Sequence, residues 1–112
     1  MRVLVVGGTG HIGSYLVPRL VQAGHTVTVV ARHARPQYSD TRLSWGAVQC
    51  ITADRGQEER GPQWAERMGR IATDVVMDLI CYRPAQQETM LAAFRGRVRH
   101  FLHCGTIWAY GA

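Results

Sequence analysis

Glycines near the start of the chain could hold a phosphate group: Gly7, Gly8, Gly10 and Gly13. They follow a short apolar run and open a segment with helical spacing, which is the strand, turn and helix order of a dinucleotide-binding turn. Glycine suits such a turn because it allows a positive φ, a close approach of the backbone to a pyrophosphate, and tight packing of helix on sheet. The pyrophosphate would accept hydrogen bonds from the N–H groups of His11, Ile12 and Gly13, where the helix dipole favours negative charge. The alternative is a tight turn of purely structural use.

Cysteines are the other side chains with distinctive chemistry. Cys50, Cys81 and Cys104 are widely spaced, and each lies in or at the end of an apolar run. A metal site would need pairs at ligand spacing, and His103 with Cys104 is the only adjacent pair of soft ligands. We therefore expect three reduced, buried thiols and no metal site.

The composition is typical of one ordinary globular domain. The chain has 112 residues, of which 46% are apolar and 19% charged, unlike the low apolar content of disordered proteins. The longest uninterrupted apolar runs, such as residues 3–6, are far shorter than the ~20 residues that cross a bilayer. No signal peptide pattern is visible at the start, so we expect a cytoplasmic protein without membrane contact.

The net charge of the chain is +5, and all 13 basic residues are arginine. A positive, arginine-rich chain could attract RNA or DNA through phosphate contacts. Between residues 55 and 70, however, arginines and glutamates are interleaved: Arg55, Arg60, Arg67 and Arg70 with Glu58, Glu59 and Glu66. This mixture predicts a solvated helix and loop surface, which makes nucleic acid the less favoured partner.

Apolar patterning predicts strands that alternate with helices. Short β-branched or apolar runs predict strands at residues 2–6, 26–31, 46–52, 75–81 and 98–104. Helical spacing predicts helices over residues 12–23 and 84–94, and a third that starts at Pro62 and includes Trp64, Met68 and Ile71. Pro18 should kink the first helix without ending it. Residues 32–45 are a candidate functional loop, because unstructured connections of this length are uncommon in compact domains.

This alternation predicts the fold class. We expect an α/β fold, a Rossmann-like doubly wound parallel sheet with strand order 3-2-1-4-5, helices on both faces and right-handed crossovers. The sheet would stop after about the fifth strand, which ends close to the last residue of the chain.

The spacing of Gly7, Gly10 and Gly13 resembles the G-x-x-G-x-x-G turn of short-chain dehydrogenases/reductases, specifically their extended or atypical epimerase/dehydratase branch. Gly8, Gly10 and Gly13 also fit G-x-G-x-x-G, so the roles of Gly7 and Gly8 could be exchanged. The segment Gly24-His25-Thr26-Val27, which leads into the second strand, strengthens the resemblance.

The end of the second strand bears on the choice of cofactor. In the family that the chain resembles, an acidic residue there commonly binds the ribose hydroxyls of adenosine, and the matching position is Ala31. Arg32 follows at once, with His33 and Arg35 close behind. A guanidinium can pair with a 2′-phosphate in a forked geometry, and the less favoured alternative for any one of these arginines is a solvated loop residue. The resemblance therefore favours NADP over NAD.

Three further positions lie beside the cofactor in the resemblance. Asp54 matches the aspartate that accepts a hydrogen bond from the adenine amino group, although a helix N-cap is an equal alternative. Arg55, the next residue, joins it in the candidate site. Leu79-Ile80-Cys81 stands where the family usually has Leu-Ala-Ala and the backbone borders the cofactor, which makes Cys81 a candidate contact. The bulkier side chains indicate an atypical member.

Residues 104–111 resemble the family's Ser-Ser-x-x-x-Tyr-Gly passage after the fifth strand. Thr106 matches the hydroxyl residue that hydrogen-bonds the reacting group of the substrate and is the catalytic candidate; the alternative is a threonine satisfied by local backbone. Tyr110 does not match the family's proton donor, which lies further on in a Tyr-x-x-x-Lys where the lysine lowers the pKa of the phenol.

The resemblance implies an oxidoreductase, epimerase or dehydratase that binds NAD(P) and acts on a sugar nucleotide or a related carbonyl or alcohol substrate. Residues 1–112 would form its NAD(P)-binding Rossmann domain, without the substrate-binding and catalytic C-terminal part. We expect this segment alone to be inactive, and a homo-oligomer is compatible with it. Two alternatives remain: a non-catalytic dinucleotide-binding sensor and an RNA-binding Rossmann protein.

Overall fold

The computed structural model describes residues 1–33 and 45–104 of the chain. These residues form a five-stranded parallel sheet of order β3-β2-β1-β4-β5. The strands are β1 (Arg2–Val6), β2 (Thr26–Ala31), β3 (Gln49–Thr52), β4 (Val75–Asp78) and β5 (His100–His103). The helices are α1 (His11–Gln22), α2 (Arg55–Glu58), α3 (Gln63–Gly69) and α4 (Pro84–Phe94). The predicted fold class and strand order are confirmed.

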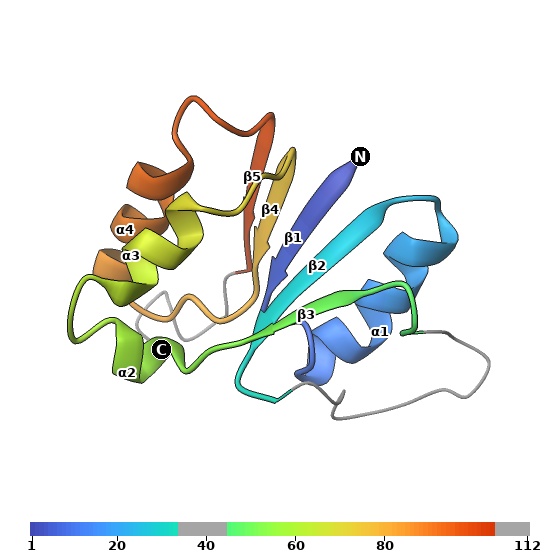
Figure 1. Ribbon diagram of the computed structural model, residues 1–112, viewed down its shortest axis with the longest axis horizontal. Helices are drawn as coiled ribbons and strands as arrows, with labels where there is room; N and C mark the ends of the chain where they lie inside the picture. The colour runs from blue at the N-terminus through green and yellow to red at the C-terminus, as the bar shows by residue number, and fades with distance from the viewer. Residues whose placement is uncertain (34–44, 105–112) are drawn as a thin grey trace, which may run out of the picture.

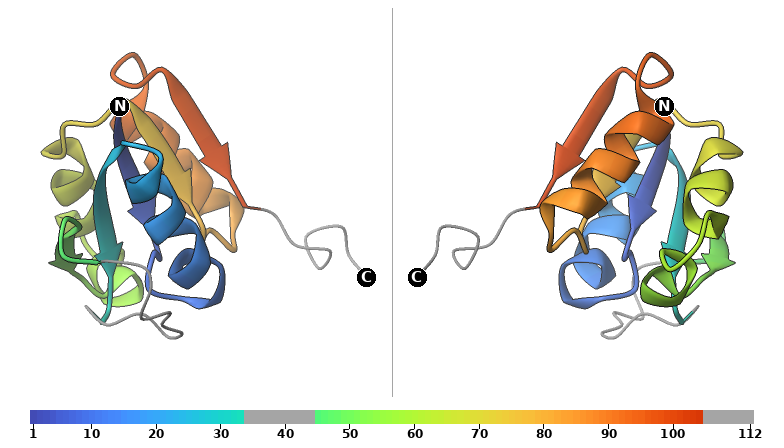
Figure 2. Two further views of the ribbon diagram at one scale, coloured as in Figure 1. Left: turned by 90° about the vertical axis from the view of Figure 1, so that its right-hand side faces the viewer. Right: turned by 90° about the vertical axis from the view of Figure 1, so that its left-hand side faces the viewer.

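Helices cover both faces of the sheet, with α1 on one side and α3 and α4 on the other (Figures 1 and 2). The core under α1 contains these buried side chains: Val3, Val5, Val17, Val27 and Val29. The core under α3 and α4 contains Leu4, Val6, Trp64, Met68, Met90 and Phe94. Successive residues of β1 thus enter opposite cores, which explains why this strand is apolar throughout.

The longer helices follow their sequence signals closely. Helix α4 occupies the predicted residues 84–94, and α1 continues through Pro18 to Gln22. Pro62 precedes the first residue of α3, and this helix buries Trp64 and Met68 against the sheet as their spacing predicts. The helix ends at Gly69, so Ile71, predicted as its third apolar residue, lies beyond it and packs on the same core. Helix α2 has four residues, which is too short for apolar periodicity to indicate a helix.

Three strands are shorter than their apolar runs. β3 begins at Gln49 because the Val48 N–H donates to the Trp45 carbonyl (3.1 Å) in a turn before it. β4 ends at Asp78, whose side chain accepts a hydrogen bond from the Ile80 N–H (3.2 Å) and turns the backbone out of the sheet. β5 covers only His100–His103 of the predicted residues 98–104. The apolar run continues past β4 because Ile80 packs on the core under α3 and α4.

The prediction that all three cysteines are buried is wrong. All three are free thiols, but only Cys81 is buried, while Cys104 is half-buried and Cys50 is exposed. Cys50 lies on β3, an edge strand of the sheet. Burial raises the pKa of the Cys81 thiol, so this side chain stays protonated at neutral pH.

Neither a membrane span nor a metal cluster is found among the described residues. No helix between residues 1 and 33 or between 45 and 104 is long and apolar enough to cross a bilayer. The same residues contain no group of three or more histidine, cysteine, aspartate or glutamate side chains placed to hold a metal ion.

An ion pair joins the start of β1 to the residue before β4 and makes stability depend on pH. Arg2 Nη2 lies 3.1 Å from Asp74 Oδ1. Hydrogen bonds from the side chain and the backbone N–H of Arg2 lower the pKa of Asp74 to about 2. A carboxyl whose pKa is lowered by folding stabilises the folded state above its unfolded pKa, and this contribution is lost as the pH falls towards the folded pKa.

We therefore expect the Tm of the native chain to fall more steeply than that of Asp74→Asn between pH 3.8 and about 2. Thermal unfolding followed by circular dichroism at several pH values measures both profiles. Parallel profiles for the two proteins would contradict the prediction, because asparagine does not titrate in this range.

Candidate functional site

The glycine-rich turn joins the end of β1 to the start of α1, at the edge of the sheet where the carboxyl ends of the strands lie (Figure 1). Gly7 adopts a φ of +84°, a conformation that side chains with a Cβ rarely adopt. Its N–H donates to the Val30 carbonyl of β2 (2.7 Å), and its carbonyl accepts from the Gly10 N–H (3.1 Å). Gly8 has no positive φ, so Gly7 takes the tight-turn role that the sequence left open between them.

Gly8 and Gly13 are required by packing. A Cβ at Gly13 would lie 2.2 Å from the Gly8 carbonyl oxygen, so the first turn of α1 rests directly on the backbone of the glycine-rich turn. A Cβ at Gly8 would lie 2.8 Å from a methyl group of Val29. These two positions bring the helix close to the sheet, which is one of the uses predicted for glycine here.

Gly10 differs from the other glycines of the turn, because the space beside it is open. A Cβ at this position would meet only the Gly7 carbonyl oxygen, at 3.4 Å. Gly10 is the N-cap of α1 and has an extended backbone with φ −77°. The absence of a side chain therefore leaves room for an approaching group without being needed for the turn itself.

The first turn of α1 can bind an anion. N–H groups in the first turn of any helix have no acceptor within the helix, and here they belong to His11, Ile12 and Gly13. The N-cap makes no side-chain hydrogen bond and the first turn contains no acidic residue. The helix dipole therefore acts on a bound anion without competition from a carboxylate of this turn.

Arg32 and Asp54 lie at the same edge of the sheet. Ala31 at the end of β2 pairs with Thr52 at the end of β3, so the residues that follow both strands leave the sheet side by side. Ala31 is buried, whereas Arg32 and Asp54 are exposed. Asp54 Oδ1 accepts a hydrogen bond from the Gln57 N–H (3.2 Å) and caps α2. The N-cap alternative for Asp54 is thus observed, and its contact with adenine stays a prediction.

Arg55 is inside the protein. The expectation that it lies on a solvated surface is wrong: its side chain is 4% exposed, and Nη1 lies 2.9 Å from Oδ1 of Asp78, which is 0% exposed. This ion pair directs the Arg55 guanidinium towards the end of β4, and the suggested direct contact with the cofactor stays untested. Asp78 was missed at the sequence level, although an acidic residue within an apolar strand signals a buried partner of opposite charge.

The turn after β4 packs on the glycine-rich turn. The Leu79 N–H donates to the Val6 carbonyl (3.0 Å). Ile80 Cγ2 occupies the space beside Gly7, 2.6 Å from where a Cβ would be. Cys81, the candidate contact of this turn, is 7% exposed. Leu79 and Ile80 therefore hold the turn after β4 directly against the glycine-rich turn at the carboxyl edge of the sheet.

A model of a known protein family matches most of the chain. The model of the NAD dependent epimerase/dehydratase family matches residues 3–95, which include the glycine-rich turn and both ends of the Arg55–Asp78 ion pair. The chain belongs to this family. Its members are described as NAD dependent, and the doubly wound sheet with a glycine-rich first turn is the arrangement that binds such dinucleotides.

Solved structures of similar fold include three informative ones. A UDP-glucose-4-epimerase from Stenotrophomonas maltophila with bound NAD and formylated UDP-arabinopyranose has a TM-score of 0.69 and 24% identity, over 99% of this chain and 38% of its own. A UDP-glucose 4-epimerase from Thermotoga maritima with UDP-glucose has a TM-score of 0.67 and 20% identity, over 95% and 38%. A short chain dehydrogenase family protein from Francisella tularensis has a TM-score of 0.69 and 16% identity, over 99% and 53%.

These structures share the fold with this epimerase/dehydratase family member, which spans 38% of the length of both epimerases. Among curated proteins, no sequence matches the chain. Thr106, the catalytic candidate, and Arg35 lie outside the described residues. The structure therefore brings together Gly7, Gly10 and the first turn of α1 from the predicted site, with Arg32 and Asp54 at the same edge of the sheet. Cys81 follows Ile80 in the turn after β4 and is buried.

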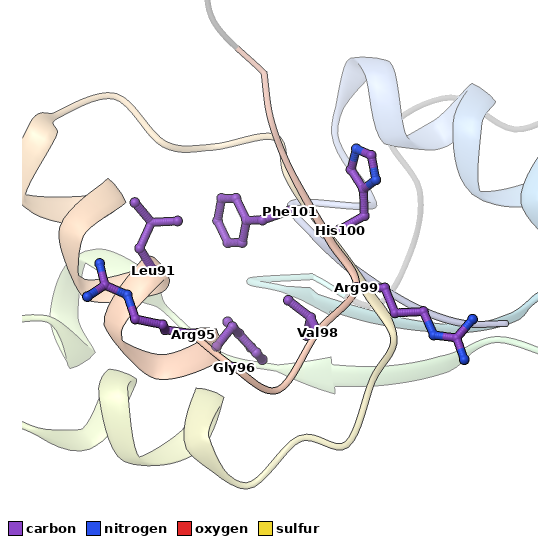
Figure 3. A pocket seen from close by; sticks show the side chains of 8 residues that line it. Leu91, Arg95, Gly96, Val98, Arg99, His100 and Phe101 are labelled. Atoms are coloured by element: carbon purple, nitrogen blue, oxygen red, sulfur yellow. The ribbon is translucent and has the colours of Figure 1, made fainter.

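One pocket of this family member lies at the opposite edge of the sheet. It is lined by the end of α4, the connection to β5 and the first residues of β5, and its volume is about 120 Å³. In Figure 3, Leu91 and Phe101 point towards each other across it, whereas Arg99 and His100 point away. The pocket is smaller than the ~300 Å³ at which ligand sites begin and is remote from the glycine-rich turn, so it is not a cofactor site.

Proposed function

We propose that the chain is the NAD(P)-binding portion of an epimerase, dehydratase or reductase, and that its glycine-rich turn holds the cofactor pyrophosphate. The observation that carries this proposal is the open position at Gly10 beside the first turn of α1. There a pyrophosphate can reach N–H groups that have no acceptor within the helix, and no Cβ stands in its way.

The residues of this chain bind and orient the cofactor. The N–H groups of residues 11–13 would donate hydrogen bonds to the pyrophosphate, and exposed Asp54 could accept a hydrogen bond from adenine with the carboxylate that also caps α2. The turn around Ile80 and Cys81 would border the cofactor beside Gly7. The bound nicotinamide itself supplies the hydride chemistry.

The proposed substrate is a sugar nucleotide or a related carbonyl or alcohol compound. The epimerases of similar fold are described with a UDP sugar or sugar derivative bound, and membership of the epimerase/dehydratase family supports the same class for this protein. Thr106 would hydrogen-bond the reacting hydroxyl or carbonyl, since a hydroxyl both donates and accepts at neutral pH.

Direct titration tests the proposed function. NAD⁺, NADH, NADP⁺ and NADPH are each added to the chain and the heat of binding is measured by calorimetry. We expect saturable binding of one dinucleotide per chain, and competition by ADP-ribose, which carries the pyrophosphate without the nicotinamide. If none of the four dinucleotides binds, the proposal is overturned.

We also propose that NADPH binds more tightly than NADH, because exposed Arg32 follows buried Ala31 at the end of β2. Hydrogen bonds to charged groups contribute about 1.5–3 kcal/mol, so Arg32→Ala should weaken NADPH binding by about tenfold or more. The affinity for NADH should change little. Fluorescence titration of both cofactors measures this difference.

Arg70→Ala is the matched control for Arg32→Ala, since Arg70 is an exposed arginine at the C-cap of α3. It should leave both affinities unchanged. Equal binding of NADH and NADPH by the native chain, or an equal loss of both in Arg32→Ala, would contradict the assignment of the 2′-phosphate to Arg32.

A further inference from the structure

We propose that Arg55 is a positioning residue for the cofactor site: its buried ion pair with Asp78 holds the β4–α4 turn, residues 79–83, against the glycine-rich turn. The inference rests on the proposed function, because it concerns the same site. It assigns to Arg55 an indirect role in cofactor binding, through the shape of the surface beside Gly7.

The ion pair connects two parts of the candidate site, the start of α2 and the end of β4. Arg55 Nη1 donates to both carboxylate oxygens of Asp78, at 2.9 and 3.1 Å. Arg55 is the first residue of α2, directly after Asp54, and Asp78 is the last residue of β4. The pair therefore connects the segment that contains Asp54 to the end of β4, which residues 79–83 follow.

The same groups also bind the backbone of the turn. Arg55 Nη1 donates to the Ile80 carbonyl (3.2 Å), and Asp78 Oδ1 accepts from the Ile80 N–H (3.2 Å). Both backbone groups of Ile80 are thus held by the ion pair. Since the Ile80 side chain fills the space beside Gly7, a change at the ion pair would be transmitted to the glycine-rich turn by direct contact.

A second set of hydrogen bonds extends from Arg55 to the far end of the turn. Arg55 Nε donates to Glu59 Oε2 (3.3 Å), and Glu59 Oε1 accepts from Gln86 Nε2 (2.9 Å). Gln86 Oε1 then accepts from the N–H groups of Tyr82 (2.7 Å) and Arg83 (3.2 Å). Arg55 thereby supports the turn at both ends, directly at Ile80 and through Glu59 and Gln86 at residues 82–83.

Stability alone gives a weak reason for burying these charges. The desolvation of two ions can exceed their mutual attraction, and well-packed apolar residues often replace a buried pair without loss of stability. The guanidinium also lies over the Trp64 ring, 5.1 Å from its centroid, where an apolar side chain would pack as well. What an apolar side chain cannot supply is the set of directed hydrogen bonds to the turn.

Two double variants with the same substitutions separate positioning from stability. Arg55→Met with Asp78→Asn removes the buried pair but keeps a side-chain oxygen for the Ile80 N–H. Arg2→Met with Asp74→Asn removes the ion pair at the opposite edge of the same sheet and is the matched control. Both are compared with the native chain in unfolding, in NADPH and NADH titration, and in hydrogen exchange of individual amides.

In the Arg55/Asp78 variant we expect the better-bound cofactor to bind about tenfold more weakly or worse, equivalent to at least ~1.4 kcal/mol. The amides of Tyr82 and Arg83 should exchange faster, although neither substituted side chain bonds them. In the control, affinity and exchange at both amides should stay as in the native chain. A purely structural role of Arg55 would lower the unfolding midpoint and leave cofactor affinity unchanged well below that midpoint.

Gln86→Met provides a second test that leaves the buried charges in place, should the Arg55/Asp78 variant not fold. It removes the oxygen that accepts from Tyr82 and Arg83, and we expect it too to weaken cofactor binding. Native affinity in whichever variants fold overturns the positioning role alone. Absence of binding to the native chain overturns the proposed function, and the positioning role with it.

Discussion

Gly10→Val is expected to abolish dinucleotide binding while leaving the chain folded. The Gly10 backbone has φ −77° and ψ −165°, a conformation that valine adopts readily. A Cβ there meets only the Gly7 carbonyl oxygen at ordinary contact distance, 3.4 Å. The branched side chain would nevertheless stand where the pyrophosphate approaches the first turn of α1. Circular dichroism measures the fold, and calorimetry with the better-bound cofactor measures binding.

Two other glycines provide the contrast. Gly13→Ala should disrupt folding itself, because its Cβ would lie 2.2 Å from the Gly8 backbone, which no side-chain rotation relieves. Gly69→Ala is the neutral control, since a Cβ there meets nothing within 4 Å, and alanine favours a helix. Native affinity in a folded Gly10→Val variant would show that the turn has a structural use only.

Arg55→Met alone is expected to lower the free energy of unfolding by about 3–5 kcal/mol, because it leaves Asp78 buried without its partner. Asp78 is 0% exposed, so water cannot replace the guanidinium without opening the structure. Such a loss is a large share of the ~5–15 kcal/mol that stabilises a typical domain. Urea denaturation followed by circular dichroism measures it.

Adding Asp78→Asn to Arg55→Met should recover much of that loss, since it removes the unpaired charge. Arg2→Met should cost far less than Arg55→Met, because the Arg2 side chain is 56% exposed and solvent screens an exposed pair. An Arg55→Met variant that unfolds at the urea concentration of the native chain would mean that the ion pair contributes nothing to stability.

Local sequence determined the architecture of this protein and the place of its candidate site. Strand and helix periods alternate along the chain, and right-handed parallel crossovers leave few ways to arrange them, so the strand order followed. The glycines after β1 were also informative by themselves. A positive φ at Gly7 and a helix that rests on Gly8 are backbone requirements that exclude a Cβ. The presence of glycine at these positions therefore indicates the turn in the sequence itself.

Tertiary structure decided where the strands end, which thiol is exposed, and what Arg55 does. An apolar run looks the same in a strand and in the turn that packs beside it, so the end of β4 depended on the Asp78 side chain. Cys50 is exposed because β3 is an edge strand. Arg55 among glutamates looks solvated until the fold brings Asp78, 23 residues away in the chain, to its guanidinium. Contacts between residues so far apart depend on the assembled sheet, which no local pattern encodes.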